Sequence, residues 1–218
     1  MTLFENNKNR ITKISSPLSN RMRPTIFEDF VGQEHIMSSE SILRISIEQD
    51  MIPSMIFWGP PGTGKTTLAR LISQKTQCRF IQISAINSNV SELRKIINDS
   101  ETQLGEYSKK TILFIDEIHR FSKSQQDSLL SAIENGILKL IGATTENPSF
   151  TINNPILSRS RVFTLKPLSR ENLLEIIERA INNKENGLGK YQFSLNNNVK
   201  DYLITVSKGD ARILLDLL

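Results

Sequence analysis

The sequence contains a single cysteine, Cys78, among its 218 residues, so no disulfide can form within the chain. It also lacks any run of about 18 apolar residues, the length that a membrane-spanning helix needs. Its first residues have neither the apolar core nor the small-residue cleavage site of a secretory signal. These absences exclude disulfide-stapled and membrane-spanning classes of protein, and they favour a cytoplasmic protein with no membrane partner.

Acidic residues are scarce at the start of the chain. The net charge is +4, and the first 25 residues hold five basic side chains and one acidic one, which accounts for the whole excess. Such a segment, rich in Asn and Ser, suits contact with the phosphates of a nucleic acid. The same composition suits a solvated terminus, and the sequence leaves both alternatives open. We expect residues 1–20 to be a flexible basic arm.

One stretch, MIFWGPPGTGKTTLAR at Met55–Arg70, matches the phosphate-binding pattern G-x-x-x-x-G-K-[ST]. An apolar run typical of a buried strand precedes the glycines, and a segment with helical spacing follows them. The glycines allow a close backbone approach, so that successive N–H groups point at phosphate oxygens. Lys65 is placed to reach the β- and γ-phosphates, and the hydroxyl of Thr66 is placed to hold Mg²⁺. The predicted nucleotide-binding residues of this loop are Gly59, Pro60, Pro61, Gly62, Thr63, Gly64, Lys65, Thr66 and Thr67.

A pair of carboxylates, Asp116 and Glu117, follows the apolar run 111–115. Two carboxylates at the end of a buried strand are costly unless they serve a cation or a water molecule. Ligands of parallel sheets bind at the carboxyl ends of the strands, so we expect Asp116 to lie beside the phosphate loop and to hold Mg²⁺. Glu117 is then placed to polarise the attacking water as a general base.

Apolar runs of strand length alternate with segments of helical spacing, which predicts an α/β fold, a parallel sheet with helices on both faces. The expected strands are 55–58, 80–83, 111–115, 139–143 and 162–165. The expected helices between them are 32–49, 67–77, 91–98, 123–134 and 155–158. Beyond Pro167 no strand run stands out, and helices are expected from 169, over 196–206 and over 210–218. The predicted organisation is an arm (1–20), a nucleotide-binding α/β domain (21–167) and a partial helical lid (168–218).

Three further residues each have two interpretations. Thr145, with Asn147 as a helper, follows the run 139–143 and can contact the γ-phosphate or the attacking water, but it also suits a strand-ending turn. Arg159 follows a short helix and can stabilise transition-state charge in a neighbouring subunit, although surface arginines are usually solvated. Arg212 opens the last helix and can fold back onto the phosphates, or can simply face solvent.

Taken together, these motifs resemble those of an AAA+ ATPase, one class of P-loop NTPase. The amino-acid sequence of the motifs is similar to that of the RarA/MgsA family (replication-associated recombination protein A, related to the Werner-helicase-interacting ATPase). The stretches that carry the resemblance are PLSNRMRPTIFEDFVGQEHI, WGPPGTGKTTLARLI, ILFIDEIHRFSKSQQDSLLSAIENG, LIGATTENPSF and LSRSRVF. The resemblance implies sensor 1 at Thr145, an arginine finger at Arg159 and sensor 2 at Arg212. It also implies that Val31, Gly32 and Ile36 lie near the adenine.

The resemblance further implies ATP and Mg²⁺ as ligands, hydrolysis of ATP, and a role at stalled replication forks in DNA replication, recombination and repair. The implied partners are single-stranded or forked DNA, replication proteins and further copies of the chain, in the cytoplasm at the nucleoid. The chain ends in ARILLDLL, a helix stopped in mid-pattern, and family members continue past Leu218, so we expect a C-terminally truncated form with weak ATPase activity. Two alternatives stay open: a RuvB-type Holliday-junction branch-migration motor, and a clamp-loader-like scaffold that binds nucleotide without turnover.

Overall fold

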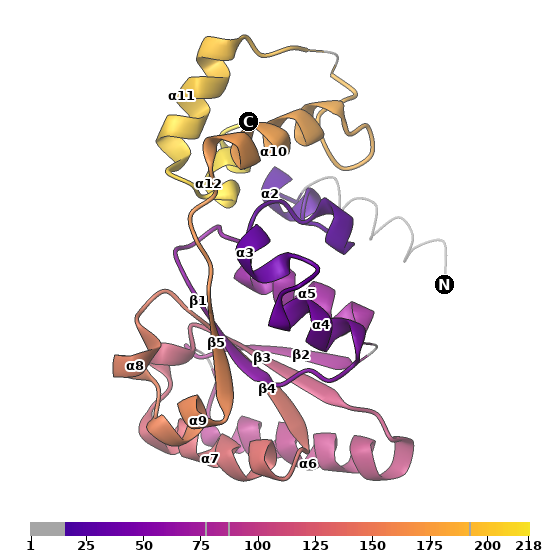
Figure 1. Cartoon of the computed structure of the whole chain (residues 1–218), viewed down its shortest axis with the longest axis vertical. Helices are drawn as coiled ribbons and strands as arrows, with labels where there is room; N and C mark the ends of the chain where they lie inside the picture. Colours follow the sequence, from indigo (N-terminus) through magenta and orange to yellow (C-terminus); the bar gives the residue numbers. More distant parts are fainter. Residues whose placement is uncertain (1–15, 77, 87, 192) are drawn as a thin grey trace. The chain divides into compact units, whose positions relative to one another are not determined.

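The computed structural model describes residues 16–218 apart from 77, 87 and 192 (Figure 1). The chain divides into two compact units. Gln33–Lys166 form an α/β unit, and the described residues up to Gly32 join Pro167–Leu218 in a helical unit. No helix in the described ranges is long and apolar enough to cross a membrane.

The α/β unit is built on a five-stranded sheet with the order β2-β3-β4-β1-β5, in which every pair is parallel. The strands are β1 (Ser54–Trp58), β2 (Arg79–Ser84), β3 (Thr111–Asp116), β4 (Leu138–Thr144) and β5 (Ser160–Thr164). The three apolar residues at the middle of β1 are fully buried, and so are those of β3 from Ile112 to Ile115. Continuous apolar strands of this kind require cover on both faces. The predicted α/β fold with a parallel sheet is confirmed.

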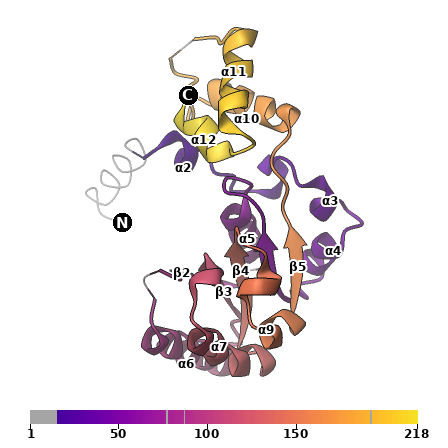
Figure 2. The same ribbon diagram turned by 90° about the vertical axis from the view of Figure 1, so that its left-hand side faces the viewer.

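Helices cover both faces of the sheet. They are α3 (Glu34–Met37), α4 (Ile42–Glu48), α5 (Lys65–Lys75), α6 (Val90–Tyr107), α7 (Lys123–Glu134), α8 (Pro148–Thr151) and α9 (Asn154–Ser158), with the short 3-10 helix η2 (Ile118–Arg120). Figures 1 and 2 show α5 on one face and the adjacent pair α6 and α7 on the other. The core beneath α6 and α7 is aliphatic, with Leu93, Leu113, Ile115 and Leu129 among its fully buried members.

Two helix predictions were wrong in detail, and one helix was not predicted. The single helix expected over 32–49 is two helices, because Ser41 caps α4 by accepting the N–H of Arg44 and donates its hydroxyl to the carbonyl of Ile36. Helix α6 starts after Asn89, whose side chain accepts the N–H of Glu92, and it extends nine residues past the expected end. The sequence did not indicate α8, a single turn that begins with a proline.

The helical unit contains α2 (Leu18–Arg21), the 3-10 helix η1 (Phe27–Asp29), α10 (Arg170–Asn182), α11 (Asn197–Ser207) and α12 (Ala211–Asp216). Leu173, Ile177 and Leu214 form the centre of its core. Capping side chains fix the helix starts: Ser169 begins α10 with a capping box, and Asp210 accepts two N–H groups of α12. The predicted helical character of this region is confirmed.

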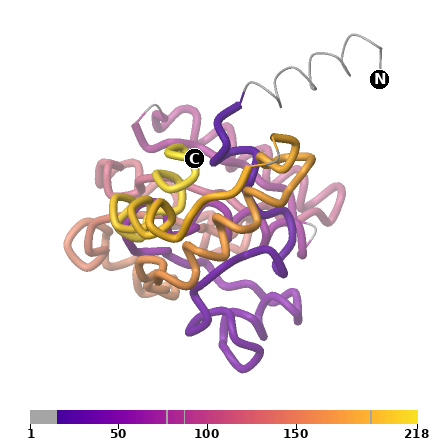
Figure 3. The backbone as a smooth tube through the Cα atoms, turned by 90° about the horizontal axis from the view of Figure 1, so that it is seen from above, coloured from indigo at the N-terminus to yellow at the C-terminus, as the bar shows by residue number. Residues whose placement is uncertain are grey.

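The boundaries expected at residues 20 and 21 differ from the structure. Leu18 is 8% exposed and packs with Ala180 and Leu215, so residues 16–20 are not a free arm, because an apolar side chain there anchors α2 against α12. Figure 3 shows this start of the described chain, in indigo, beside the last helix, in yellow. Residues 21–32, which we expected in the α/β domain, belong to the helical unit. The rest of the expected basic arm, with Lys8, Arg10 and Lys13, lies outside the described residues.

Candidate nucleotide-binding site

The phosphate-loop motif connects the carboxyl end of β1 to the first turn of α5. Gly62 and Gly64 have φ angles of +69° and +100°, in the left-handed region that favours glycine. Gly59 is needed for a different reason, since a Cβ there would lie 2.3 Å from the carbonyl oxygen of Leu165. The loop therefore brings the backbone N–H groups of the first turn of the eleven-residue helix α5 to one point, as an anion site requires.

Lys65 lies inside this loop. Its ammonium donates hydrogen bonds of 2.7 Å to the carbonyl oxygens of both Gly59 and Pro60, and the residue is 8% exposed. Thr63 also donates its hydroxyl to the carbonyl of Pro60, at 2.9 Å. A buried cation held by backbone carbonyls at the mouth of a helix is well placed to exchange those acceptors for phosphate oxygens. Pro61, Thr66 and Thr67 complete the turn, all with some exposure to solvent.

The carboxylates Asp116 and Glu117 lie at the same edge of the sheet. Asp116 is the last residue of β3, and Glu117 turns the chain with φ 55° and ψ 46° into η2. This left-handed conformation is uncommon for a residue with a side chain and is concentrated at functional sites. Strand β4 separates β3 from β1, so the acid pair is one strand further from the phosphate loop than the expected position beside it.

The end of β4 lies between the acid pair and the phosphate loop. The N–H of Gly59 donates to the carbonyl of Thr144 at 3.1 Å, which joins the phosphate loop to this strand end. Thr144 is fully buried, whereas Thr145 is exposed. Asn147 uses its side chain to cap α8 through the N–H of Ser149. The role of Thr145 toward a nucleotide stays a prediction.

Two residues that the sequence analysis did not single out are bonded into the site. The side chain of His119 is 7% exposed and lies within 3.0–3.4 Å of Thr144, Glu117 and Glu146. The amide of Gln33 donates to the carbonyl of Lys166 at 2.7 Å and accepts the N–H of Lys166 at 2.9 Å. The same amide nitrogen lies 3.4 Å from the carbonyl oxygen of Thr63 in the phosphate loop. The position of His119 three residues after Asp116 was a usable signal, while the partners of Gln33, 30 and 133 residues away, left none.

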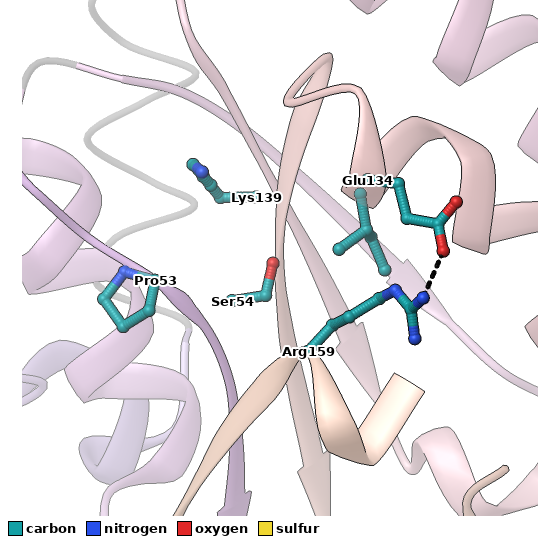
Figure 4. A pocket seen from close by; sticks show the side chains of 6 residues that line it. Pro53, Ser54, Glu134, Lys139 and Arg159 are labelled. Carbon is teal, nitrogen blue, oxygen red and sulfur yellow. Dashed lines mark ion pairs between the residues drawn. The ribbon is translucent and has the colours of Figure 1, made fainter. Parts of the chain in front are cut away.

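Arg159 lies at the opposite edge of the sheet. It precedes β5, whose first residue pairs with Ser54 at the start of β1, whereas the phosphate loop follows the end of β1. Its guanidinium binds Glu134 at 2.6 Å and donates to the carbonyl of Pro155 at 2.9 Å. Figure 4 shows this ion pair at a pocket lined by Pro53, Ser54, Ile133, Glu134, Lys139 and Arg159. About 13 Å of strand separates Arg159 from its own phosphate loop, by the usual rise per residue.

The remaining candidates are distributed over both units. Val31, Gly32 and Arg212 belong to the helical unit, and Ile36 belongs to the α/β unit. Gly32 has φ +80°, and Arg212 is exposed in the first turn of α12, where its N–H is bound by the side chain of Asp210. Their contacts with adenine or phosphate stay predictions.

A metal ion at this site would depend on few protein ligands. Among the described residues, no three His, Cys, Asp or Glu side chains gather as a metal site. The site does supply the two oxygen donors that the sequence indicated, the hydroxyl of Thr66 in the first turn of α5 and the carboxylate of Asp116 at the end of β3. Mg²⁺ bound with a nucleotide uses one or two protein oxygens, with phosphates and water as its other ligands, so the residues present fit it.

Comparison with known proteins agrees with this geometry. The ATPase family associated with various cellular activities (AAA) matches residues 55–168. Replication-associated recombination protein A of Coxiella burnetii is 47% identical over 202 residues, which are 93% of this chain and 45% of that protein. The ATPase WRNIP1 of Dictyostelium discoideum is 42% identical over 94% of this chain and 23% of its own length. The chain thus spans less than half the length of these relatives.

A solved structure is also similar in three dimensions. The Thermotoga maritima RuvB Holliday junction branch migration motor superposes with a TM-score of 0.71 and 28% identity, over 90% of this chain and 64% of the other. The similarity includes most of both units, and the sequence match of the family includes the phosphate loop, the acid pair and Arg159. With this match to the family over residues 55–168, the chain belongs to the AAA family of ATPases.

Proposed function

We propose that this chain binds Mg-ATP at the edge of the sheet formed by Gly59–Thr67 and Asp116–Glu117. We propose that it hydrolyses ATP: water attacks the γ-phosphorus, the bond to the β-phosphate oxygen breaks, and ADP and phosphate are released. The observation that carries the proposal is the convergence of a helix start, a buried ammonium and two carboxylates at the carboxyl ends of β1 and β3. A site of this composition can neutralise phosphate charge on one side and activate water on the other.

Each residue has a definite task in this reaction. Lys65 leaves the carbonyls of Gly59 and Pro60 and binds the β- and γ-phosphate oxygens. Thr66 and Asp116 would hold Mg²⁺, which would screen the charge of the phosphates. Glu117 accepts a hydrogen bond from the attacking water and aligns it with the γ-phosphorus, and Thr145 contacts the γ-phosphate.

We further propose that the site is completed by a second copy of the chain. Arg159 and the phosphate loop lie at opposite ends of the same pair of strands, so one subunit cannot bring them together without unfolding β1 and β5. A finger that acts on a neighbour needs this arrangement, because head-to-tail contact puts the amino edge of one sheet against the carboxyl edge of the next. Val31, Gly32 and Ile36 would bind the adenine, and Arg212 would respond to the phosphates.

The biological role proposed here rests on relatives named for replication-associated recombination. It places the chain in the cytoplasm at the nucleoid, with single-stranded or forked DNA and replication proteins as partners. The similarity to RuvB supports a second candidate, a branch-migration motor on Holliday junctions. The two differ in preferred DNA: stimulation of ATP turnover by forked or single-stranded DNA supports the first, and stimulation by four-way junctions alone supports the second.

Binding of Mg-ATP is the first test. Titration of the purified chain with a fluorescent ATP analogue should give saturable binding that Lys65→Ala weakens at least tenfold, because a buried cation on the phosphates is lost. Lys75→Ala, at the exposed end of the same helix, is the matched control and should bind as the wild type does. Unchanged affinity in Lys65→Ala would overturn the phosphate-loop assignment. Binding without turnover, at concentrations that permit assembly, would support the scaffold alternative.

A further inference from the structure

His119 is the most enclosed ionisable side chain next to the acid pair, and the proposed reaction has not used it. Its Nδ1 lies 3.0 Å from Oγ1 of Thr144 and 3.3 Å from Oε2 of Glu117, and its Nε2 lies 3.4 Å from Oε1 of Glu146. Glu117 is at the end of β3, and the other two residues are at the end of β4. The ring therefore connects the general-base candidate to the neighbouring strand.

The backbone around His119 leaves the ring little freedom. The carbonyl of Glu117 accepts the N–H of Arg120 at 2.9 Å, and the carbonyl of Ile118 accepts the N–H of Phe121 at 3.0 Å. Ile118 and Phe121, on either side of this turn, are 0% and 4% exposed within the main core. Because the core holds both ends of η2, the position of the histidine is set by packing rather than by its polar contacts.

The chemistry of the neighbours determines which ring nitrogen donates. A carboxylate such as Glu117 only accepts hydrogen bonds, and the hydroxyl of Thr144 already accepts the N–H of Glu146 at 3.0 Å and donates to its carbonyl at 3.2 Å. The free lone pair of that hydroxyl and the Glu117 oxygen both face Nδ1. A proton on Nδ1 satisfies both acceptors, whereas a bare Nδ1 would face two oxygens without a donor. The carboxylate of Glu146 near Nε2 is 55% exposed, so water can supply hydrogen bonds to it, and Nδ1 has the stronger need of the proton.

We propose that His119 is a positioning residue: its Nδ1–H holds Oε2 of Glu117 against the end of β4, which leaves Oε1 to orient the attacking water. This inference rests on the proposed role of Glu117. It adds that His119 and the adjacent strand β4 align the carboxylate. Without the hydrogen bond from His119, the side chain of Glu117 is not held in the orientation that efficient turnover needs.

The first test compares two substitutions of the same residue. His119→Leu fills the space without a donor, and His119→Asn places an amide N–H near the position of Nδ1. His119→Leu should lower kcat by about 10- to 100-fold with the affinity for ATP within about twofold of the wild type, the effect of losing one hydrogen bond to a charged group. His119→Asn should recover kcat to within about threefold. Arg120→Ala, an exposed change in the same turn, is the control and should leave both quantities unchanged.

A double substitution separates positioning from damage to the fold. In a Glu117→Gln background, His119→Leu should lower single-turnover hydrolysis no further, because the group that it aligns is already gone. Multiplied losses in the double variant would overturn the proposal, as would a wild-type kcat in His119→Leu or an Asn variant as slow as the Leu variant. If the Glu117→Gln variant hydrolysed ATP as fast as the wild type, that result would instead contradict the proposed function of Glu117.

A second measurement does not depend on turnover. The chain has two histidines, so the ring nitrogens of His119 and His35 can be assigned in a protein labelled with ¹⁵N-histidine. The spectrum should show His119 as the Nδ1–H tautomer, and Glu117→Gln should shift the His119 signals and leave those of His35 in place. An Nε2–H tautomer, or signals of His119 that ignore Glu117→Gln, would overturn the proposal.

Discussion

The two edges of the same sheet differ in what holds them. At the carboxyl edge, the phosphate loop is fixed by backbone bonds, such as that from Gly59 to Thr144, and by the buried ammonium of Lys65. At the amino edge, Arg159 and Glu134 form an ion pair whose side chains are 41% and 46% exposed. One edge is rigid and preorganised, while the other is bound by an interaction that solvent largely screens. The difference fits the proposal that the first edge binds the nucleotide and that the second edge is available to a partner surface.

The largest effect should come from the amino edge, and only in an assembly. At concentrations where the chain self-associates, Arg159→Ala should lower ATP turnover per subunit by about 10³- to 10⁵-fold, the measured range for arginine fingers. In dilute solution the same substitution should change almost nothing. Turnover is measured against protein concentration, with Arg161→Ala as the control, since Arg161 is exposed on β5 two residues away. A rate per subunit that is flat with concentration and indifferent to Arg159→Ala would remove the trans-acting role and leave the phosphate loop unaffected.

The carboxyl edge should respond at every concentration. Glu117→Gln should reduce hydrolysis by about 10²- to 10⁴-fold, because the water loses its acceptor, while ATP still binds to the intact phosphate loop. Phosphate release and equilibrium binding of ATP, measured on the same preparation, separate the two. Loss of binding together with hydrolysis would place Glu117 in ATP binding instead of water activation.

The rigidity of the carboxyl edge can be measured as stability. Gly59→Ala should lower the free energy of unfolding by about 1–3 kcal/mol, since the new Cβ would lie 2.3 Å from a backbone oxygen that cannot easily move. Gly105→Ala is the matched control: nothing lies within 4 Å of a Cβ there, inside α6, so the same change should raise stability by about 0.4–1 kcal/mol. Urea unfolding followed by circular dichroism gives both values. Equal changes at the two glycines would mean that Leu165 relaxes at little cost.

The smallest effect should come from the partner of Arg159. Glu134→Gln removes the charge that binds the guanidinium, so the concentration at which turnover rises should fall by about twofold to fivefold, within the worth of an exposed ion pair. The free energy of unfolding should change by less than about 0.5 kcal/mol for the same reason. A concentration dependence identical to that of the wild type would indicate that the ion pair has no influence on Arg159.

The sequence predicted what depends on local pattern. All five strands were found from their short runs rich in apolar residues. Helix α7 was found too, and its start is fixed by a capping box of Ser122 and Gln125. The residues of the phosphate loop and the acid pair were visible because their chemistry lies within a few consecutive positions. Errors arose where several polar residues allowed either a helix or a break, as before α4.

Contacts between distant segments could not be read from the sequence. The bonds of Gln33 join residues 133 positions apart, and those of His119 to Thr144 span 25 positions. The position of β4 between β3 and β1 has the same character, because strand order follows from crossover connections that leave no local pattern. The burial of Leu18 is another example. It lies in a polar segment, and its apolar side chain is buried only because it packs with the distant residues Ala180 and Leu215.

The hydrogen bonds between Gln33 and Lys166 have a consequence for circular permutation of the α/β unit. These are the first and last residues of that unit, and the amide of one bonds to the backbone of the other at 2.7 and 2.9 Å. The two ends of the unit are therefore neighbours, as they are in a domain inserted into another domain. A short linker should join them, so that new termini could be opened at an exposed turn such as Asn135–Gly136 in a circular permutant with the sheet intact.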